Sequence, residues 1–313
     1  MALREIPNIP IPKIEDYLDK IQETHQWKTM KCKLVTPIHG GGVEARSSDK
    51  DLPIRVAAIR GQLRFWWRLL AKHKPEWGLS EKSAKEFREQ EFVLWGGMAD
   101  GEDGGNASLV FLRVKVSNKL EDGLLKNYIS EWNERKRKEE TTVLSYALFT
   151  ARKETTNHVP EMTLGKEGLM WTLQWRFSEK ISDMQKEQVS ETLRWWATLG
   201  GIGGRTRRGC GAFEVENVKL VSLDEMEALG CEILSSKNKD KLALQAWSES
   251  ISSWKDIRKA NKTAFKQLFG KEDNTRHLAT VFSRPVKVGN QWRGVVVMLP
   301  NSSNGLKAIL GKK

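Results

Sequence analysis

A segment rich in glycine and arginine carries the clearest chemistry in this 313-residue sequence. Residues 196–213 read WATLGGIGGRTRRGCGAF and combine six glycines with three arginines. Glycine lets a backbone adopt positive φ and approach a ligand closely, and arginine offers a planar fork of donors that suits phosphate oxygens. The segment therefore predicts a phosphate-binding loop, with RNA as the favoured partner, made by Gly201, Gly203, Gly204, Arg205, Arg207 and Arg208.

Two common phosphate-binding motifs do not fit this loop. A Walker A motif needs a Gly-Lys-Ser/Thr ending, yet the loop has no lysine, and Leu199 stands where its first glycine belongs. A dinucleotide fingerprint that began at Gly201 would place its third glycine at Thr206. A plain flexible turn between a helix and a strand remains an alternative, and the three arginines favour the phosphate hypothesis over it.

The charge balance agrees with an anionic partner. The chain has 52 Lys and Arg against 40 Asp and Glu, a formal net charge of +12. Such a field recruits nucleic acid or an anionic surface without saying which. Because no apolar run is long enough to span a bilayer and the first twenty residues lack the apolar core of a signal peptide, we expect a soluble, cytoplasmic protein with no membrane partner.

The sequence offers no set of metal ligands. Cys32, Cys210 and Cys231 are an odd number without CxxC spacing, and the five histidines are scattered. We expect reduced, packed thiols, no metal and no cofactor.

The order of predicted elements indicates an α+β fold. Strands are expected near 27–38, 108–116, 169–177 and 212–221, and helices near 54–73 and 183–199. Each strand–helix–strand series resembles a split βαβ unit with its helix on one face of an antiparallel sheet. The pattern predicts two ferredoxin-like, RNA-recognition-motif-like halves.

These halves suggest a division of the chain near residue 150. We expect an N-terminal ferredoxin-like domain over 1–150 and a C-terminal one over 151–300, which carries the glycine-rich loop. A helical insertion is expected over about 222–270, before closing strands near 278–288 and 291–299, and 301–313 is expected to be a flexible tail. The mixed-charge run 133–140 favours a solvated helix.

The first predicted helix carries a second group of basic residues. Arg60, Arg64 and Arg68 recur every four residues and form one stripe. Three repelling cations on one helix face destabilise it unless something acidic meets them, and we predict that these three arginines bind RNA. For Trp67 and Trp196 we predict packing in the core instead of stacking on bases.

The stripe lies in a segment that resembles a known family. Residues 59–68, IRGQLRFWWR, are similar to the Arg-Gly-x-Leu-Arg-Phe-Trp-Trp-Arg signature of subunit one of the type III-B CRISPR-Cas (Cmr) effector complexes. That family is part of the repeat-associated mysterious protein (RAMP) superfamily. The glycine-rich loop also matches, as do TPIHGG at 36–41, LWGG at 94–97 and FSRP at 282–285, where Arg284 replaces a small residue.

The resemblance implies a binding and assembly subunit at the head of a ribonucleoprotein filament, near the 3′ end of the guide RNA. The expected partners are guide RNA, target RNA and other Cmr subunits, and no enzyme activity is implied. The runner-up is a metal-independent endoribonuclease that processes CRISPR transcripts, for which His39 is the only plausible base, against a role for His39 in contacting backbone or RNA. A protein scaffold that touches no RNA is the third hypothesis, and it leaves the arginines unexplained.

Overall fold

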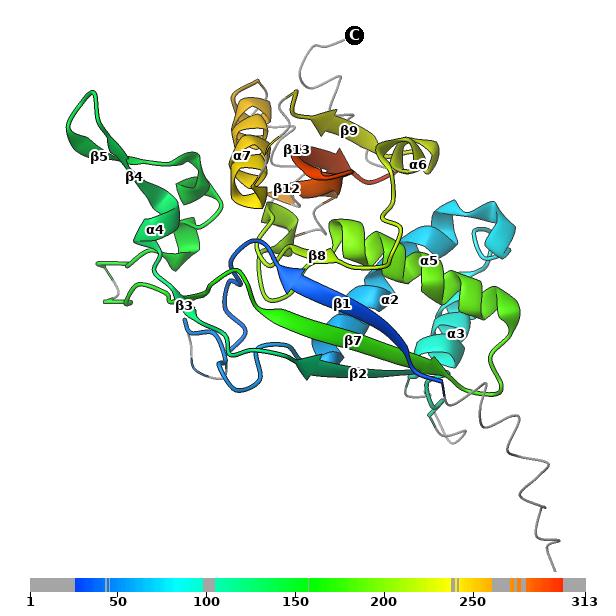
Figure 1. The fold of residues 1–313 in the computed structure, drawn as a ribbon. Coiled ribbons are helices and arrows are strands. Elements are labelled where there is room, and N and C mark those ends of the chain that lie inside the picture. Colours follow the sequence, from blue (N-terminus) through cyan, green and yellow to red (C-terminus); the bar gives the residue numbers. More distant parts are fainter. Residues whose placement is uncertain are drawn as a thin grey trace, which may run out of the picture.

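The computed structural model describes residues 26–42, 44, 46–97, 105–156, 158–237, 240, 242–260, 271–272, 275–276 and 280–300. These residues form helices and sheets that confirm the α+β class (Figure 1). The expected tail, 301–313, and the end of the expected insertion, 261–270, lie outside the described residues. No helix in the described ranges is long and apolar enough to cross a membrane.

The central sheet has four antiparallel strands in the order β2-β7-β1-β8. They are β1 (Lys28–Leu34), β2 (Val110–Val116), β7 (Met170–Phe177) and β8 (Phe213–Val215). Burial alternates along β7, where Trp171, Leu173, Trp175 and Phe177 are buried and the residues between them are not. One face of the sheet is therefore core and the other faces outward, as expected for an antiparallel sheet covered on one side.

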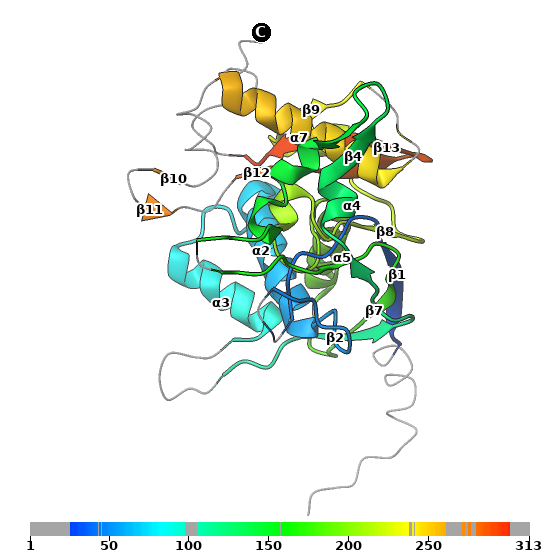
Figure 2. The same cartoon turned by 90° about the vertical axis from the view of Figure 1, so that its left-hand side faces the viewer.

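Two long helices, α2 (Val56–His73) and α5 (Asp183–Leu199), lie together on the buried face (Figures 1 and 2). A capping box between Ser182 and Gln185 fixes the start of α5. The ring centroids of Trp66 and Trp195 lie 6.2 Å apart between the helices. Both helices therefore bury their tryptophan-rich faces against each other and the sheet.

The two strand–helix–strand series share one sheet instead of making two. The first series supplies β1 and β2, and β7 of the second series lies between them. A split unit leaves a gap between its two strands, and only a strand from elsewhere can satisfy the backbone groups that line it. The two series therefore interlock into one sheet.

Three of the strands that follow β8 in the chain form a second sheet. They lie in the order β12-β13-β9. Its strands are β9 (Glu232–Ser235), β12 (Val281–Val288) and β13 (Gln291–Met298), with α7 (Ala243–Ala260) packed on β12 and β13. The segment expected as a helical insertion thus contains α6 (Leu223–Ala228), the strand β9 and α7. The strand β9 of this segment pairs with the closing strand β13.

The remaining helices and strands lie outside the two main sheets. After α2 come η1 (Pro75–Trp77) and α3 (Ala84–Trp95). Between β2 and β7 lie β3 (Asp122–Gly123), α4 (Lys126–Ile129), β4 (Ser130–Asn133), β5 (Lys138–Thr141), η2 (Val143–Tyr146), η3 (Phe149–Ala151) and β6 (Leu164–Gly165). The glycine-rich segment contains η4 (Thr206–Arg208), and β10 (Lys271–Glu272) pairs with β11 (Thr275–Arg276).

The charged run 133–140 forms the turn and second strand of the β4–β5 hairpin, so the expected solvated helix is wrong. The side chain of Asn133 accepts the N–H of Lys136 at 3.0 Å and donates to Glu140 at 2.8 Å. Arg137 takes a positive φ of 46° at the turn. Asn is well suited to such local hydrogen bonds, which compete with a helix.

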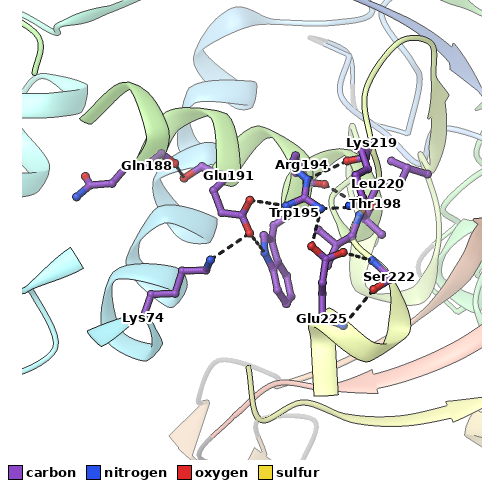
Figure 3. Close-up of polar contacts among 12 residues, drawn as sticks. Lys74, Gln188, Glu191, Arg194, Trp195, Thr198, Lys219, Leu220, Ser222 and Glu225 are labelled. Atoms are coloured by element: carbon purple, nitrogen blue, oxygen red, sulfur yellow. Dashed lines mark hydrogen bonds and ion pairs between the residues drawn. The ribbon is translucent and has the colours of Figure 1, made fainter. Parts of the chain in front are cut away.

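An ion-pair network fixes the outer side of α5 (Figure 3). Glu191 accepts from Arg194 at 2.6 Å and from the indole N–H of Trp195 at 3.1 Å. Arg194 also donates to Glu225 of α6 at 2.7 Å and to the carbonyl of Lys219 at 2.9 Å. The network therefore ties α5 to the chain that follows β8.

We predict that Trp67→Ala lowers the free energy of unfolding by roughly 3–5 kcal/mol, because the ring is fully buried against the core. Thermal and denaturant unfolding measure the loss. Trp132→Ala serves as the control, since Trp132 is 56% exposed on the hairpin and its removal should leave stability nearly unchanged. A Trp67 variant as stable as the control would contradict the packing role.

The second prediction concerns the stability of the protein at low pH. Backbone hydrogen bonding to Ser222, followed by the pairing with Arg194, lowers the pKa of Glu225 to about 2. A depressed carboxyl pKa adds stability that is complete above the unfolded pKa and is lost as pH falls toward 2. Because Glu225 is partly exposed, the pair contributes only about 0.2–1 kcal/mol.

The Glu225→Gln variant isolates this contribution, since Gln preserves a capping box. Melting temperatures of wild type and variant should differ at neutral pH and converge as pH falls from about 4.5 to about 2. A difference that stays constant across this window would show that the carboxylate charge is not the stabilising group.

Candidate RNA-binding site

The three loop arginines meet at a pocket of about 480 Å³. It lies between α2, the glycine-rich segment, α7 and β12, and its walls are Gly61, Gln62, Phe65, Trp66, Gly200, Arg205, Thr206, Arg207, Arg208, Trp254 and Phe282. Cations and aromatic rings therefore share one concave surface, the combination that binds nucleic-acid backbones and bases.

Aromatic rings contact each guanidinium, and backbone carbonyls accept hydrogen bonds from Arg205 and Arg208. Arg205 lies 4.6 Å from the ring centroid of Phe149 and donates to the carbonyl of Ala147 at 3.0 Å. Arg207 lies 5.7 Å from the rings of both Phe65 and Phe282. These contacts fix the guanidinium planes without neutralising them.

The third arginine completes the cluster. Arg208 lies 5.4 Å from the ring of Phe149 and 5.7 Å from that of Trp254, and donates to the carbonyl of Tyr146 at 3.3 Å. Burial lowers the pKa of Arg205 to about 10, with a smaller effect from Arg208. All three still carry charge at neutral pH, so the pocket is a focus of positive potential.

Carboxylates do not line this pocket. Its walls contain no Asp or Glu, and within the described residues neither Arg205 nor Arg207 has a carboxylate within ion-pair distance. Half-buried cations of this kind strongly favour an anion that enters from outside. The arrangement suits a phosphodiester backbone.

The loop glycines pack closely against the chain itself, although Gly203 and Gly204 are also exposed. A Cβ on Gly203 would come within 2.6 Å of Ile38 Cγ2, and one on Gly204 within 2.9 Å of the carbonyl oxygen of His39. Gly204 N–H donates to that same carbonyl at 2.8 Å. Gly201 is buried, where a Cβ would meet Thr206 at 3.0 Å. The glycines therefore seat the loop on residues 36–39.

His39 lies beside the loop and is half-buried. Its Nε2 is 3.0 Å from the hydroxyl of Thr150. Burial, then the charges of Arg205 and Arg46, lower its pKa to about 4. The imidazole is therefore neutral at pH 7 and is a weaker base than an ordinary histidine.

The arginine stripe of α2 is engaged inside the protein. Arg64 and Arg68 both pair with the buried carboxylate of Glu91 in α3, the latter at 2.9 Å. Arg60 donates to the carbonyl of Trp95 at 2.9 Å. The stripe therefore meets the acidic partner that its charge demands and holds α3 against α2. None of the three lines the pocket.

Arg284 is a buried cation behind the pocket wall. Its side chain is 1% exposed and donates to the carbonyl of Gly200, which lines the pocket. Its Nε has no acceptor among the described residues, and burial lowers its pKa to about 9. On β12 it shares a face with Phe282, two residues earlier. Its charge adds to the potential around the loop.

The aromatic walls were not predicted from the sequence. Phe65 belongs to the FWW motif and Phe282 to FSRP, but nothing local shows that strands and helices far apart in sequence bring both beside Arg207. Gln62 was also missed, although it sits one residue before Leu63 in the same motif. No group of three His, Cys, Asp or Glu that could hold a metal occurs in the described part of the chain.

We predict that Arg284→Met leaves thermal stability unchanged or raised. Burying an unpaired charge costs several kcal/mol, whereas the orphaned Gly200 carbonyl costs about 1–3 kcal/mol. Calorimetric melting measures the balance, with Arg194→Met as control, because Arg194 pairs with two carboxylates and its loss should destabilise. A destabilised Arg284 variant would mean that a carboxylate neutralises this guanidinium.

Comparison with known proteins places this geometry in a family. The sequence model of the RAMP superfamily matches residues 31–214, more than half of the chain. A CRISPR system Cmr subunit, Cmr1-2 of Pyrococcus furiosus, is 23% identical over 193 residues, which cover 60% of this chain and 95% of that protein.

Solved structures show the same fold. Apo Cmr1 from Pyrococcus furiosus superposes with a TM-score of 0.58 at 16% identity, covering 89% of both chains. A chain of the type III-B Cmr-beta complex bound to cognate target RNA gives a TM-score of 0.54 at 11% identity, covering 87% of this chain and 94% of that one. The matched family range, 31–214, almost coincides with the interlocked sheet and its two helices. The chain therefore belongs to the RAMP superfamily.

Proposed function

We propose that this protein is a non-catalytic, RNA-binding and assembly subunit of a type III-B CRISPR-Cas (Cmr) interference complex in the cytoplasm. It corresponds to subunit one, which lies near the 3′ end of the guide RNA. Its partners are the guide RNA, the target RNA and neighbouring Cmr subunits. The similarity to Cmr1 and to a chain of an RNA-bound Cmr complex supports this role in antiviral defence.

One observation carries the proposal: three arginines converge on a pocket whose walls contain aromatic rings and no carboxylate. Arg205, Arg207 and Arg208 neutralise phosphates, and the rings that hold them exclude water from the contact. Gly201, Gly203 and Gly204 act through the shape of the loop, since their close contacts are with the chain itself. Phosphate contacts carry no base information, so the pocket binds a backbone of any sequence.

The arginine stripe and His39 take supporting roles in this proposal. Arg60, Arg64 and Arg68 hold α3, and their exposed edges extend the positive field toward RNA. His39 accepts the loop through its carbonyl and leaves a neutral ring beside Arg205.

We further infer that the interlocked sheet is a ferredoxin-like unit. The chain order β1-α2-β2-β7-α5-β8 with sheet order β8-β1-β7-β2 is that of two split βαβ units joined in one antiparallel sheet. The sheet of β9, β12 and β13 with α7 forms the C-terminal unit. The proposed division thus falls after β8 instead of near residue 150.

A metal-independent endoribonuclease remains the competing function. Cleavage through the 2′-hydroxyl needs a general base with a pKa near the working pH. The neighbouring cations Arg205 and Arg46 oppose protonation of His39, so the ring is a poor proton acceptor at pH 7. The geometry favours binding over cleavage.

Replacing Arg205, Arg207 and Arg208 together by alanine tests the proposed function. We expect binding to unrelated single-stranded RNAs to weaken about equally, with the log-log salt slope reduced by roughly 0.7 for each phosphate that the protein no longer neutralises. Fluorescence anisotropy across a salt series measures both quantities. Alanines at the exposed residues Lys82, Lys85 and Lys180 provide a control with the same charge change.

An unchanged salt slope in the loop variant would refute phosphate binding by these arginines. The same samples, incubated with a CRISPR repeat RNA with and without magnesium, test the competing function. We expect no cleavage by the wild-type protein. Cleavage by the wild-type protein that is lost in the His39→Ala variant would refute the non-catalytic role and support the endoribonuclease.

A further inference from the structure

The outward face of the central sheet is a second surface with nucleic-acid chemistry. Helices α2 and α5 cover the opposite face, and no described helix covers this one (Figures 1 and 2). Strand register arranges its side chains in rows across β1, β7 and β2. Thr29, Gln174 and Arg113 form one row, and Lys31, Thr172 and Lys115 form the next.

A stack of aromatic rings and arginines lies beside the first row. Arg113 is 4.2 Å from the ring centroid of Trp27, and Arg176 is 5.5 Å from Trp27 and 4.5 Å from Phe111. Phe111 and Arg176 are direct cross-strand partners, and Phe111 is 38% exposed. Large rings rarely stand on an open sheet face unless something packs on them, and the arginines hold these rings in fixed planes.

The charges on this face are unevenly compensated. At the β8 edge, Lys31 lies 3.7 Å from Glu216 and Lys33 lies 4.0 Å from Glu214. On β2 and β7 there is no acidic residue, and Arg113, Lys115 and Arg176 have no carboxylate within ion-pair distance among the described residues. The half of the face that carries the rings is therefore the half with unopposed positive charge.

A hollow continues the surface at its other end. A depression of about 350 Å³ lies over β1, β7 and β8, and its walls include Lys31, Lys33 and Thr172 together with Glu214 and Glu216. Successive rows on a strand are roughly 6.7 Å apart, so a strip several rows long leads from the rings to this depression. Uncharged donors and acceptors from Thr172 and Gln174 occupy the middle of the strip.

We propose that this sheet face is a second RNA site, which binds single-stranded RNA independently of the loop pocket. Bases stack on Phe111 and Trp27, while Arg113, Lys115 and Arg176 pair with phosphates. An acidic protein surface would use the cations but gain little from the rings, so the rings favour RNA. The two sites lie on opposite sides of the sheet, since α2 lines the loop pocket and packs on the other face.

A triple change on β2, Phe111→Ala, Arg113→Ala and Lys115→Ala, tests this site. All three side chains are exposed, so the fold should persist, which thermal melting checks. Binding of a short oligo(U) RNA is measured by anisotropy in the full chain, both with the loop arginines intact and with all three replaced by alanine. The double change Lys82→Ala, Lys85→Ala removes the same charge elsewhere.

With the loop arginines replaced, we expect the β2 variant to bind oligo(U) about tenfold or more weakly than its parent, because a stacking ring is removed. The log-log salt slope should fall by about 1.4 for two phosphate contacts. The lysine control should change affinity less than twofold. Phe111→Trp alone should retain binding, and Phe111→Ala alone should lower affinity without changing the salt slope.

Two results would overturn the second site. One is a β2 variant whose affinity and salt slope match those of the lysine control. The other is an equal loss of binding to polyglutamate and to oligo(U), which would mark the face as a surface for acidic proteins. Neither result bears on the loop pocket, because the variant without the three loop arginines tests that site separately.

Discussion

The contact between α2 and α5 is the constraint on which the rest of the structure depends. Each helix donates a buried tryptophan N–H to a glutamine of the other, Trp67 to Gln188 and Trp196 to Gln62, both at 3.1 Å. Buried polar groups need such partners, and these two bonds fix the helices in register. Gln62 also accepts the N–H of Gly201 at 3.3 Å. The same side chain thus sets the helix pair and the start of the glycine-rich loop.

The glycines and the arginines of the loop have different roles. Its glycines allow the chain to fold back on residues 36–39 and on itself, where any side chain would clash with Ile38 or His39. Its arginines point the other way, toward a pocket walled by rings. Arg205 even adopts a positive φ of 55°, an uncommon conformation for a residue with a side chain. The tight backbone of the loop therefore positions the arginine side chains at the pocket.

Two groups of arginines differ in their partners, those that pair with carboxylates and those that contact aromatic rings. Arg64, Arg68 and Arg194 meet carboxylates and hold accessory helices to α2 and α5. Arg205, Arg207 and the arginines of the outward sheet face contact aromatic rings and have no carboxylate within ion-pair distance among the described residues. A cation on a ring keeps its full charge for an incoming anion, whereas a carboxylate compensates part of the charge of the cations that it pairs with.

Local patterns in the sequence determined much of this protein. The helical pattern predicted α5 near 183–199, and glycine with arginine identified the loop. The sequence did not reveal that β7 inserts between β1 and β2, or that Glu91 meets the arginine stripe while Phe282 reaches Arg207. Strand pairing and ion pairing join residues far apart in the chain, and their energy depends on burial that only the folded packing creates. Residue types and spacing fix the elements, but the partners of each charge are decided in three dimensions.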